Sequence, residues 1–356
     1  MSQPAMRLCQ LDQGQSADPR RPGSQAAARR RGGGPGLGQM KKLLLAFLAL
    51  FALSAEGQSY PQRPIRMIVP FAAGGTTDAL GRVLAVFMSD RLGQQVVIEN
   101  RPGGGGTLGA EVAARSQPDG YTLLLGSAEA FGMTEGMRQR LAYSPERDLV
   151  PVAMVARSPN IFIVHPSVPV KSVAELIEFS KSKNVRYGSP GVGSNPHLIG
   201  ELFAHRFKLN MTHVPYKGGG AGIADVVSGQ IEMLITGIAT SVGRIKAGQV
   251  RALVMTGGAR SPLVPEVPTM AEAGVDDFVL GALFGVFTPA AAPNEVIERL
   301  SRELTAISRN PEFSKRLIDI GQELTEPLLG EAFGRSIRAE AARWRELSTM
   351  AGVKEE

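Results

Sequence analysis

The sequence has one cysteine and four histidines in 356 residues. A single cysteine excludes a disulfide scaffold and any zinc or iron–sulfur site built on cysteines. The histidines, at positions 165, 197, 205 and 213, show neither a His-x₃-His nor a Glu-x-x-His spacing. We therefore expect no metal site.

Long hydrophobic runs and concentrated positive charge are also missing. The longest apolar run, residues 43–53, would span about 16 Å as a helix, against roughly 30 Å for a bilayer core. Residues 1–57 carry +5 of the total net charge of +6, which leaves +1 for residues 58–356. Because nucleic-acid binding rests on clustered Lys and Arg, we expect no nucleic-acid partner.

The N-terminal segment has the layout of an export signal. Residues 40–57 combine Met-Lys-Lys, the short apolar run and a small-residue cleavage site, which predicts a signal peptide. Residues 1–39 then form an extension ahead of the true start at Met40. A twin-arginine signal built on residues 29–31 is the alternative. We expect a periplasmic, freely soluble protein whose mature chain begins near Gln58.

From residue 60 onward, short strand-like runs alternate with helical patterns. Residues 65–69 predict a strand, and the apolar spacing over 77–92 predicts a helix that ends at Gly93. Residues 172–175, Ser-Val-Ala-Glu, form a capping box that opens another helix. This order predicts an α/β fold with mainly parallel sheets flanked by helices.

Two glycine- and hydroxyl-rich loops, residues 71–78 and 188–197, each join a predicted strand to a predicted helix. Glycine lets a ligand approach the backbone closely, and the free N–H groups at a helix N-terminus attract anions. Thr76, Thr77 or Asp78 can cap the first helix, and Ser194 the second. Facing each other across a cleft, the loops would bind a carboxylate; plain strand–helix turns are the alternative.

The sequence contains no convincing enzyme motif. The pattern Gly104-x-Gly106-x-x-Gly109 formally matches the dinucleotide fingerprint, but Arg101-Pro102 separates it from the strand and the following helix is short. No Gly-x-Ser-x-Gly elbow occurs. We expect no cofactor and no catalytic activity, with a secreted hydrolase as the alternative.

Several segments, taken in order over about residues 60–350, resemble one family, the Bug (TctC-type) solute receptors of tripartite tricarboxylate transporters. The segments are Tyr60-Pro61-x-x-Pro64-Ile65, residues 69–78, 99–106, 118–123, 214–218 and 265–274, and Pro289-x-x-x-Pro293. Each segment is weak alone, and the set is highly specific.

The resemblance implies a two-lobed periplasmic-binding-protein fold (type II). Lobe 1 would comprise residues 58–160 and 285–356, and lobe 2 residues 161–284. Such a receptor is a monomer that captures a small organic carboxylate between its lobes and delivers it to transporter membrane subunits. A sensor that feeds a membrane signalling protein is the alternative.

In that family, the loops corresponding to 71–78 and 188–195 hold the ligand carboxylate. The ligand-binding residues that the loops and the resemblance predict are Phe71, Ala72, Gly74, Gly75, Thr76, Thr77, Asp78, Ser127, Glu129, Gly191, Gly193, Ser194, Asn195, His197 and Thr236. Leu283 stands where the family often has Trp. Glu129 would repel a second carboxylate, which predicts a monocarboxylate with an apolar, aromatic or amine-bearing far end.

Overall fold

The computed structural model describes residues 38, 41, 60–127 and 141–350. Nearly all of the predicted extension and of the signal peptide, and Glu129, lie outside these residues. In the described part, no helix is long and apolar enough to cross a membrane, and no group of three or more His, Cys, Asp or Glu side chains could hold a metal ion. The description below concerns the compact unit Ser59–Glu356.

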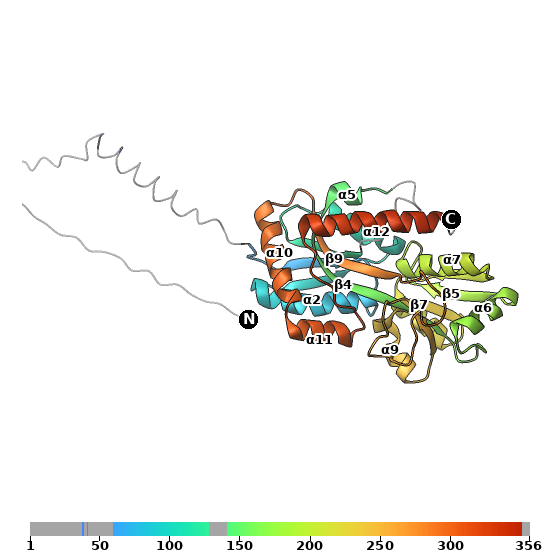
Figure 1. Ribbon diagram of the computed structural model, residues 1–356. Helices are drawn as coiled ribbons and strands as arrows, with labels where there is room; N and C mark the ends of the chain where they lie inside the picture. The colour runs from blue at the N-terminus through green and yellow to red at the C-terminus, as the bar shows by residue number, and fades with distance from the viewer. Residues whose placement is uncertain (1–37, 39–40, 42–59, 128–140, 351–356) are drawn as a thin grey trace, which may run out of the picture. The chain divides into compact units, whose positions relative to one another are not determined.

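A first strand group contains β1, β2, β3 and β9. β1 (Ile65–Val69) pairs in parallel with β2 (Val96–Asn100) and β3 (Thr122–Ser127), and β9 (Gly281–Pro289) pairs antiparallel with β3. The helices connected to this group are α2 (Thr76–Leu92), η1 (Gly104–Gly106), α3 (Thr107–Ala114), α5 (Pro145–Asp148), α10 (Asn294–Ser308) and α11 (Pro311–Asp319). Helices α2, α10 and α11 pack together beside the strands (Figure 1).

A second strand group contains β5 to β8. β5 (Val185–Ser189) pairs in parallel with β6 (Met211–Pro215) and β7 (Met233–Gly237). β8 (Arg251–Met255) pairs antiparallel with β4. The helices between these strands are α6 (Val173–Ser182), α7 (Asn195–Phe207), α8 (Gly219–Val227) and α9 (Ile238–Lys246). The predicted strand–helix alternation is confirmed, and the strands that alternate with helices, β1 to β3 and β5 to β7, pair in parallel as predicted, whereas β8 and β9 pair antiparallel.

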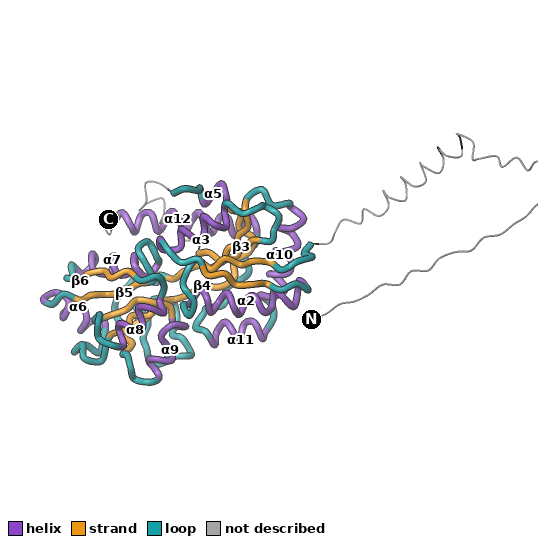
Figure 2. The backbone as a smooth tube through the Cα atoms, turned by 180° about the vertical axis from the view of Figure 1, so that it is seen from behind, coloured by secondary structure: helices purple, strands orange, loops and turns teal. Residues whose placement is uncertain are grey.

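One long strand, β4 (Leu149–Val164), runs through both groups, as Figure 2 shows. Its residues 149–159 pair with β9, and from Asn160 onward it pairs with β7 and β8. Each group has its own buried clusters, for example around Ile65 and Leu84 in the first and Phe162 and Tyr187 in the second. The chain therefore changes from one sheet region to the other near residue 160.

The last helix, α12 (Gly330–Met350), contacts both groups. Phe333 near its start packs against Phe287 of β9, with ring centroids 5.5 Å apart and ring planes tilted by 40°. Trp344, 0% exposed, lies in the buried cluster of the second group, and the helix also packs against α7. The predicted lobe boundaries remain a prediction, but α12 does not keep to the lobe to which residues 285–356 were assigned.

Candidate functional site

A cavity lies where the two strand groups meet. It encloses about 570 Å³ of space between atoms, including the part that opens to solvent. Its lining comes from segments of both groups: Phe71, Gly75, Thr76, Thr77, Gly105, Ser127, Ser158, Asn160, Pro190, Gly193, Ser194, Asn195, Pro196, Gly219, Thr236, Gly237, Ala282 and Phe284. We call it the main cavity.

Four helices begin at the main cavity. Gly75 is the N-cap of α2, Ser194 of α7 and Gly237 of α9, and Gly219 is the first residue of α8; all four line the cavity. The first N–H groups of each helix lack partners inside the helix, and the helix dipole adds partial positive charge there. Because every lining side chain among the described residues is uncharged, these helix ends supply the positive potential for an anion.

Asp78 lies behind the first loop and is not part of the cavity wall. The cap prediction was wrong, because Gly75 is the N-cap and no side chain caps the helix. Asp78, 3% exposed, accepts hydrogen bonds from the Gly74 amide at 3.0 Å, Asn100 Nδ2 at 3.0 Å and Arg82 Nε at 2.9 Å. Burial favours a higher pKa, but these donors outweigh it and lower the pKa of Asp78. The Asp78 carboxylate thus holds residues 71–78 in place from the side opposite the cavity.

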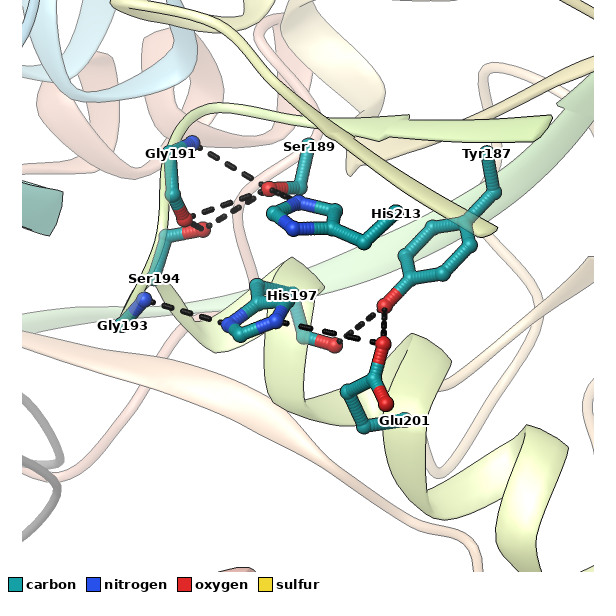
Figure 3. A network of polar contacts seen from close by, with 8 residues as sticks. All are labelled: Tyr187, Ser189, Gly191, Gly193, Ser194, His197, Glu201 and His213. Atoms are coloured by element: carbon teal, nitrogen blue, oxygen red, sulfur yellow. Dashed lines mark hydrogen bonds and ion pairs between the residues drawn. The ribbon is translucent and has the colours of Figure 1, made fainter. Parts of the chain in front are cut away.

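Internal hydrogen bonds also hold the second loop. Ser194 is the N-cap residue of α7, as predicted, but its hydroxyl does not cap the helix; it donates to the Gly191 carbonyl at 2.7 Å. The Gly191 amide donates to Ser189 Oγ at 3.2 Å. Figure 3 shows how these groups draw the loop into a tight turn. The turn exposes Gly193 and Ser194 to the main cavity.

Two stacked histidines support this loop (Figure 3). The rings of His197 and His213 lie 4.0 Å apart between centroids. The Gly193 amide donates to His197 Nδ1 at 3.1 Å, and Ser189 Oγ lies 2.7 Å from His213 Nε2. Burial lowers the pKa of His197 to about 4. Burial and the neighbouring His197 lower the pKa of His213 to about 3, so both rings are neutral at pH 7.

The Ser189–His213 contact has the distance of a nucleophile–base pair. Ser189, however, is 0% exposed and does not line the main cavity, and its hydroxyl is engaged with the Gly191 backbone. A substrate in the cavity cannot reach it. The geometry supports a structural role for this pair.

Asn160 and Asn195 form an amide pair in the cavity wall. Asn160 Nδ2 donates to Asn195 Oδ1 at 2.5 Å, while Asn195 Nδ2 is buried and has no partner among the described residues. A buried amide group without a partner costs about 1–3 kcal/mol. The pair therefore offers hydrogen-bonding capacity to a ligand.

Loops from the two strand groups touch beside the cavity. The Ala72 amide donates to the Lys217 carbonyl at 3.2 Å, and Thr76 Oγ1 lies 3.2 Å from Thr240 Oγ1. Gly105 packs so closely that an added Cβ would lie 2.1 Å from the Val192 carbonyl oxygen. Only glycine at this position permits that contact.

The structure brings most of the predicted ligand-binding residues into one cavity wall. The predicted residues that line it are Phe71, Gly75, Thr76, Thr77, Ser127, Gly193, Ser194, Asn195 and Thr236. The predicted residues that lie outside the lining are Ala72, Gly74, Asp78, Gly191 and His197. Glu129 is not among the described residues. Their role in binding remains a prediction.

Sequence reasoning missed part of the wall. The missed residues are Gly105, Ser158, Asn160, Pro190, Pro196, Gly219, Gly237, Ala282 and Phe284. A signal exists for some of them. Ser158 and Asn160 are polar residues within the strand-like segment that becomes β4, Gly219 follows the end of β6 by four residues, and Gly237 is the last residue of β7.

Two strand groups that share a long strand and enclose a cavity lined by helix N-termini define a solute-binding protein. A comparison with protein families supports this class. Residues 80–352 match the family described as "Tripartite tricarboxylate transporter family receptor" (TctC). The chain belongs to this family of periplasmic solute-binding receptors, and its fold is that of the periplasmic binding proteins, as predicted.

Individual relatives agree. The protein BugT of Bordetella pertussis is 37% identical over 270 residues, which cover 73% of this chain and 83% of BugT. The solved structure of R. palustris Rpa4515 with adipate is 33% identical, covers 83% of this chain and 99% of its own, and superposes with a TM-score of 0.79. MatC of Rhodopseudomonas palustris with bound malate is 30% identical, covers 81% of this chain and 99% of its own, and has a TM-score of 0.75.

Proposed function

We propose that this receptor binds a small organic carboxylate in the main cavity and delivers it to a membrane transporter. The observation that carries the proposal is the set of four helix N-termini at a cavity whose described lining has no charged side chain. Each helix end stabilises an anion by about 0.3–1 kcal/mol, and by up to about 2 kcal/mol where it is partly buried. No arginine is required.

The donors suit carboxylate oxygens. Gly75 and Gly219, at the starts of α2 and α8, line the cavity and carry backbone N–H groups, and Thr76 in the same wall carries a hydroxyl group. Asn195 adds an amide nitrogen without a partner in the described part of the chain. Two family members of solved structure hold carboxylates, adipate in one and malate in the other.

Apolar groups complete the wall. Phe71, Phe284 and Ala282 line the cavity together with Pro190 and Pro196, and such surfaces fit the hydrocarbon part of an organic acid. The predicted preference for a monocarboxylate rested on Glu129, which lies outside the described residues. The monocarboxylate preference therefore stays a prediction, which the panel of organic acids described below tests.

A thermal-shift panel of organic acids, confirmed by calorimetry, tests the proposal. It compares monocarboxylates with citrate, malate and succinate, and each acid with its neutral amide. We expect acids to raise the unfolding temperature and amides to have little effect, because the helix N-termini stabilise negative charge. Equal stabilisation by acids and amides would contradict carboxylate binding. Stabilisation by citrate, malate or succinate alone would contradict the monocarboxylate preference.

Asn195→Asp locates the ligand in the cavity. The change keeps the side-chain size but puts a second negative charge beside a bound carboxylate, and affinity should fall at least tenfold. Asn184→Asp is the matched control, because Asn184 is exposed and its Oδ1 already accepts a hydrogen bond from Thr212. Equal affinity in the two variants would show that the ligand does not bind beside Asn195.

The cellular part of the proposal comes from the family. The receptor acts as a monomer in the periplasm after removal of the signal peptide at residues 40–57, and it hands its ligand to the transporter's membrane subunits. Intact-mass measurement of periplasmic material should give a chain that begins near Gln58. A chain that still carries residues 1–39 would contradict this processing.

A further inference from the structure

A second cavity lies on the opposite face of β4 from the main cavity. Ser158 and Asn160 line the main cavity, whereas Pro159 between them lines the second one. This alternation follows from the pleat of a strand, in which successive side chains point to opposite faces. The second cavity encloses about 890 Å³ between atoms, including the part that opens to solvent. We call it the hinge pocket, because it lies where β4 passes from one strand group to the other.

Segments from two distant parts of the chain form the hinge pocket. One wall is Met255 with residues 258–262, which follow β8 of the second group, and the other is Ile318 with residues 321–324, at the end of α11 and beyond it. The second wall is attached to β4 through two backbone hydrogen bonds between Arg157 and Glu323, of 2.8 and 3.2 Å. The pocket shares no lining residue with the main cavity.

Gln322 lines this pocket, and its side-chain amide forms no hydrogen bond among the described residues. The residue is 4% exposed, and neither its Nε2 nor its Oε1 has a hydrogen-bond partner among residues 60–127 and 141–350. Such a group is costly to bury, so native proteins usually satisfy it with a partner. Gln322 does not line the main cavity.

Glu323 lines the same pocket with an uncompensated carboxyl group. It forms no ion pair within the described part of the chain. Burial raises its pKa, although the positive charge of Arg157 acts in the opposite direction. The carboxyl lies over the backbone at Gly257, where an added Cβ would be 2.5 Å from Glu323 Oε1. Glycine therefore makes room for this carboxyl.

The other charge in the lining is already neutralised. Arg260 Nε donates to Glu272 Oε2 at 2.8 Å, and its NH1 group donates to the Pro265 carbonyl at 3.0 Å. Among the described residues, the acceptors Glu323 and Gln322 Oε1 and the donor Gln322 Nε2 are thus the side-chain groups of Gln322 and Glu323 without a partner. Next to them lie apolar side chains, including Leu324, which is 50% exposed.

We propose that the hinge pocket binds a small organic cation with a primary ammonium group. The ammonium donates to the Glu323 carboxylate and to Gln322 Oε1, because both residues line the pocket and an ammonium group carries three N–H donors on one nitrogen. The hydrocarbon part of the cation packs against Met255, Ile318 and Leu324. This site is separate from the carboxylate site, and the proposal holds whether or not the main cavity binds carboxylates.

Ligand-observed NMR and calorimetry with n-butylamine test the proposal on the full chain at pH 7. 1-Butanol is the matched neutral probe with the same hydrocarbon body. We expect n-butylamine to bind at least tenfold more tightly than 1-butanol, because only the ammonium forms a charge-assisted hydrogen bond. Equal binding of both probes, or no binding of n-butylamine at millimolar concentration, would overturn the proposal.

Three variants locate the site. Glu323→Gln removes the charge at constant size, and Gly257→Ala displaces the carboxyl while keeping its charge; each should weaken n-butylamine about tenfold. Gln322→Met replaces the unsatisfied amide with an apolar group of similar size and should raise the unfolding temperature while weakening the amine. Asn195→Asp in the main cavity should leave the amine unaffected. Wild-type affinity in both Glu323→Gln and Gly257→Ala, or a loss in Asn195→Asp, would refute the assignment.

Discussion

Replacing Gly105 by alanine should weaken ligand binding by forcing apart two loops that meet beside the main cavity. An added Cβ would lie 2.1 Å from the Val192 carbonyl oxygen and 2.9 Å from the Gly193 carbonyl carbon. An ordinary contact begins at 3.4 Å, so the loops must separate by 3.4 − 2.1 = 1.3 Å. Both partners are backbone atoms, so no side-chain rotation relieves the clash.

Gly74→Ala is the matched control. Gly105 has φ +61° and Gly74 has φ +81°, so alanine is strained at both positions, which costs roughly 1–3 kcal/mol in each variant. Nothing lies within 4 Å of an added Cβ at Gly74. The two variants therefore share the backbone strain and differ in the contact with the facing loop.

Denaturant unfolding measures the strain, and calorimetry with an acid that the panel selects measures the affinity. We expect both variants to lose similar stability. Gly105→Ala should also lose at least tenfold in affinity, because the arrangement in which the loops touch becomes less populated. Equal affinities in Gly105→Ala and Gly74→Ala would refute the reasoning that this contact accompanies ligand binding.

Three further predictions follow from buried groups. Because burial lowers the pKa of His197 to about 4 and of His213 to about 3, the unfolded chain binds more protons below about pH 6.5. Stability should fall from pH 7 to pH 4.5 by about 2 kcal/mol per histidine, and urea unfolding without this slope in the wild type would contradict the buried neutral pair. Asp78→Ala should cost about 2 kcal/mol, because it removes the acceptor of the Gly74 amide and of Asn100 Nδ2. Arg82→Ala, which removes only the third donor at an exposed side chain, should cost less than about 1 kcal/mol, and equal losses on thermal unfolding would show that the ion pair dominates. Trp344, buried in the second core and absent from the cavity lining, should keep its emission maximum when an acid binds, and a large shift in fluorescence would contradict this placement.

Local patterns in the sequence predicted the elements well. The apolar spacing over residues 77–92 corresponds to α2, Thr76–Leu92. The predicted cap at Ser172 is present, because the Glu175 amide donates to Ser172 Oγ at 3.2 Å. The Glu175 side chain closes the turn differently from a full capping box, because its Oε2 accepts from the Lys171 amide, one residue before the N-cap. These features depend on residues that are close together in the chain, so periodicity and capping rules reach them.

The same local rules also indicated two loops that line the main cavity. Glycine and hydroxyl residues between a strand and a helix place free N–H groups at a helix N-terminus, and both predicted loops line the main cavity. A separate set of motifs, spread over residues 60–350, indicated the family, which the match over residues 80–352 confirms. The positions of these residues in the chain were sufficient for both inferences.

Tertiary structure decided which helix N-termini meet at the main cavity. The N-termini of α8 and α9 reach the cavity because β4 pairs with β7 and brings Asn160 opposite Gly237, a register that no local pattern encodes. Similarly, the apolar stripe of α12 shows which face is buried but not that Trp344 enters the second core. A helix or strand pattern specifies a face, whereas the partner of that face is set by strand order and by packing between distant segments.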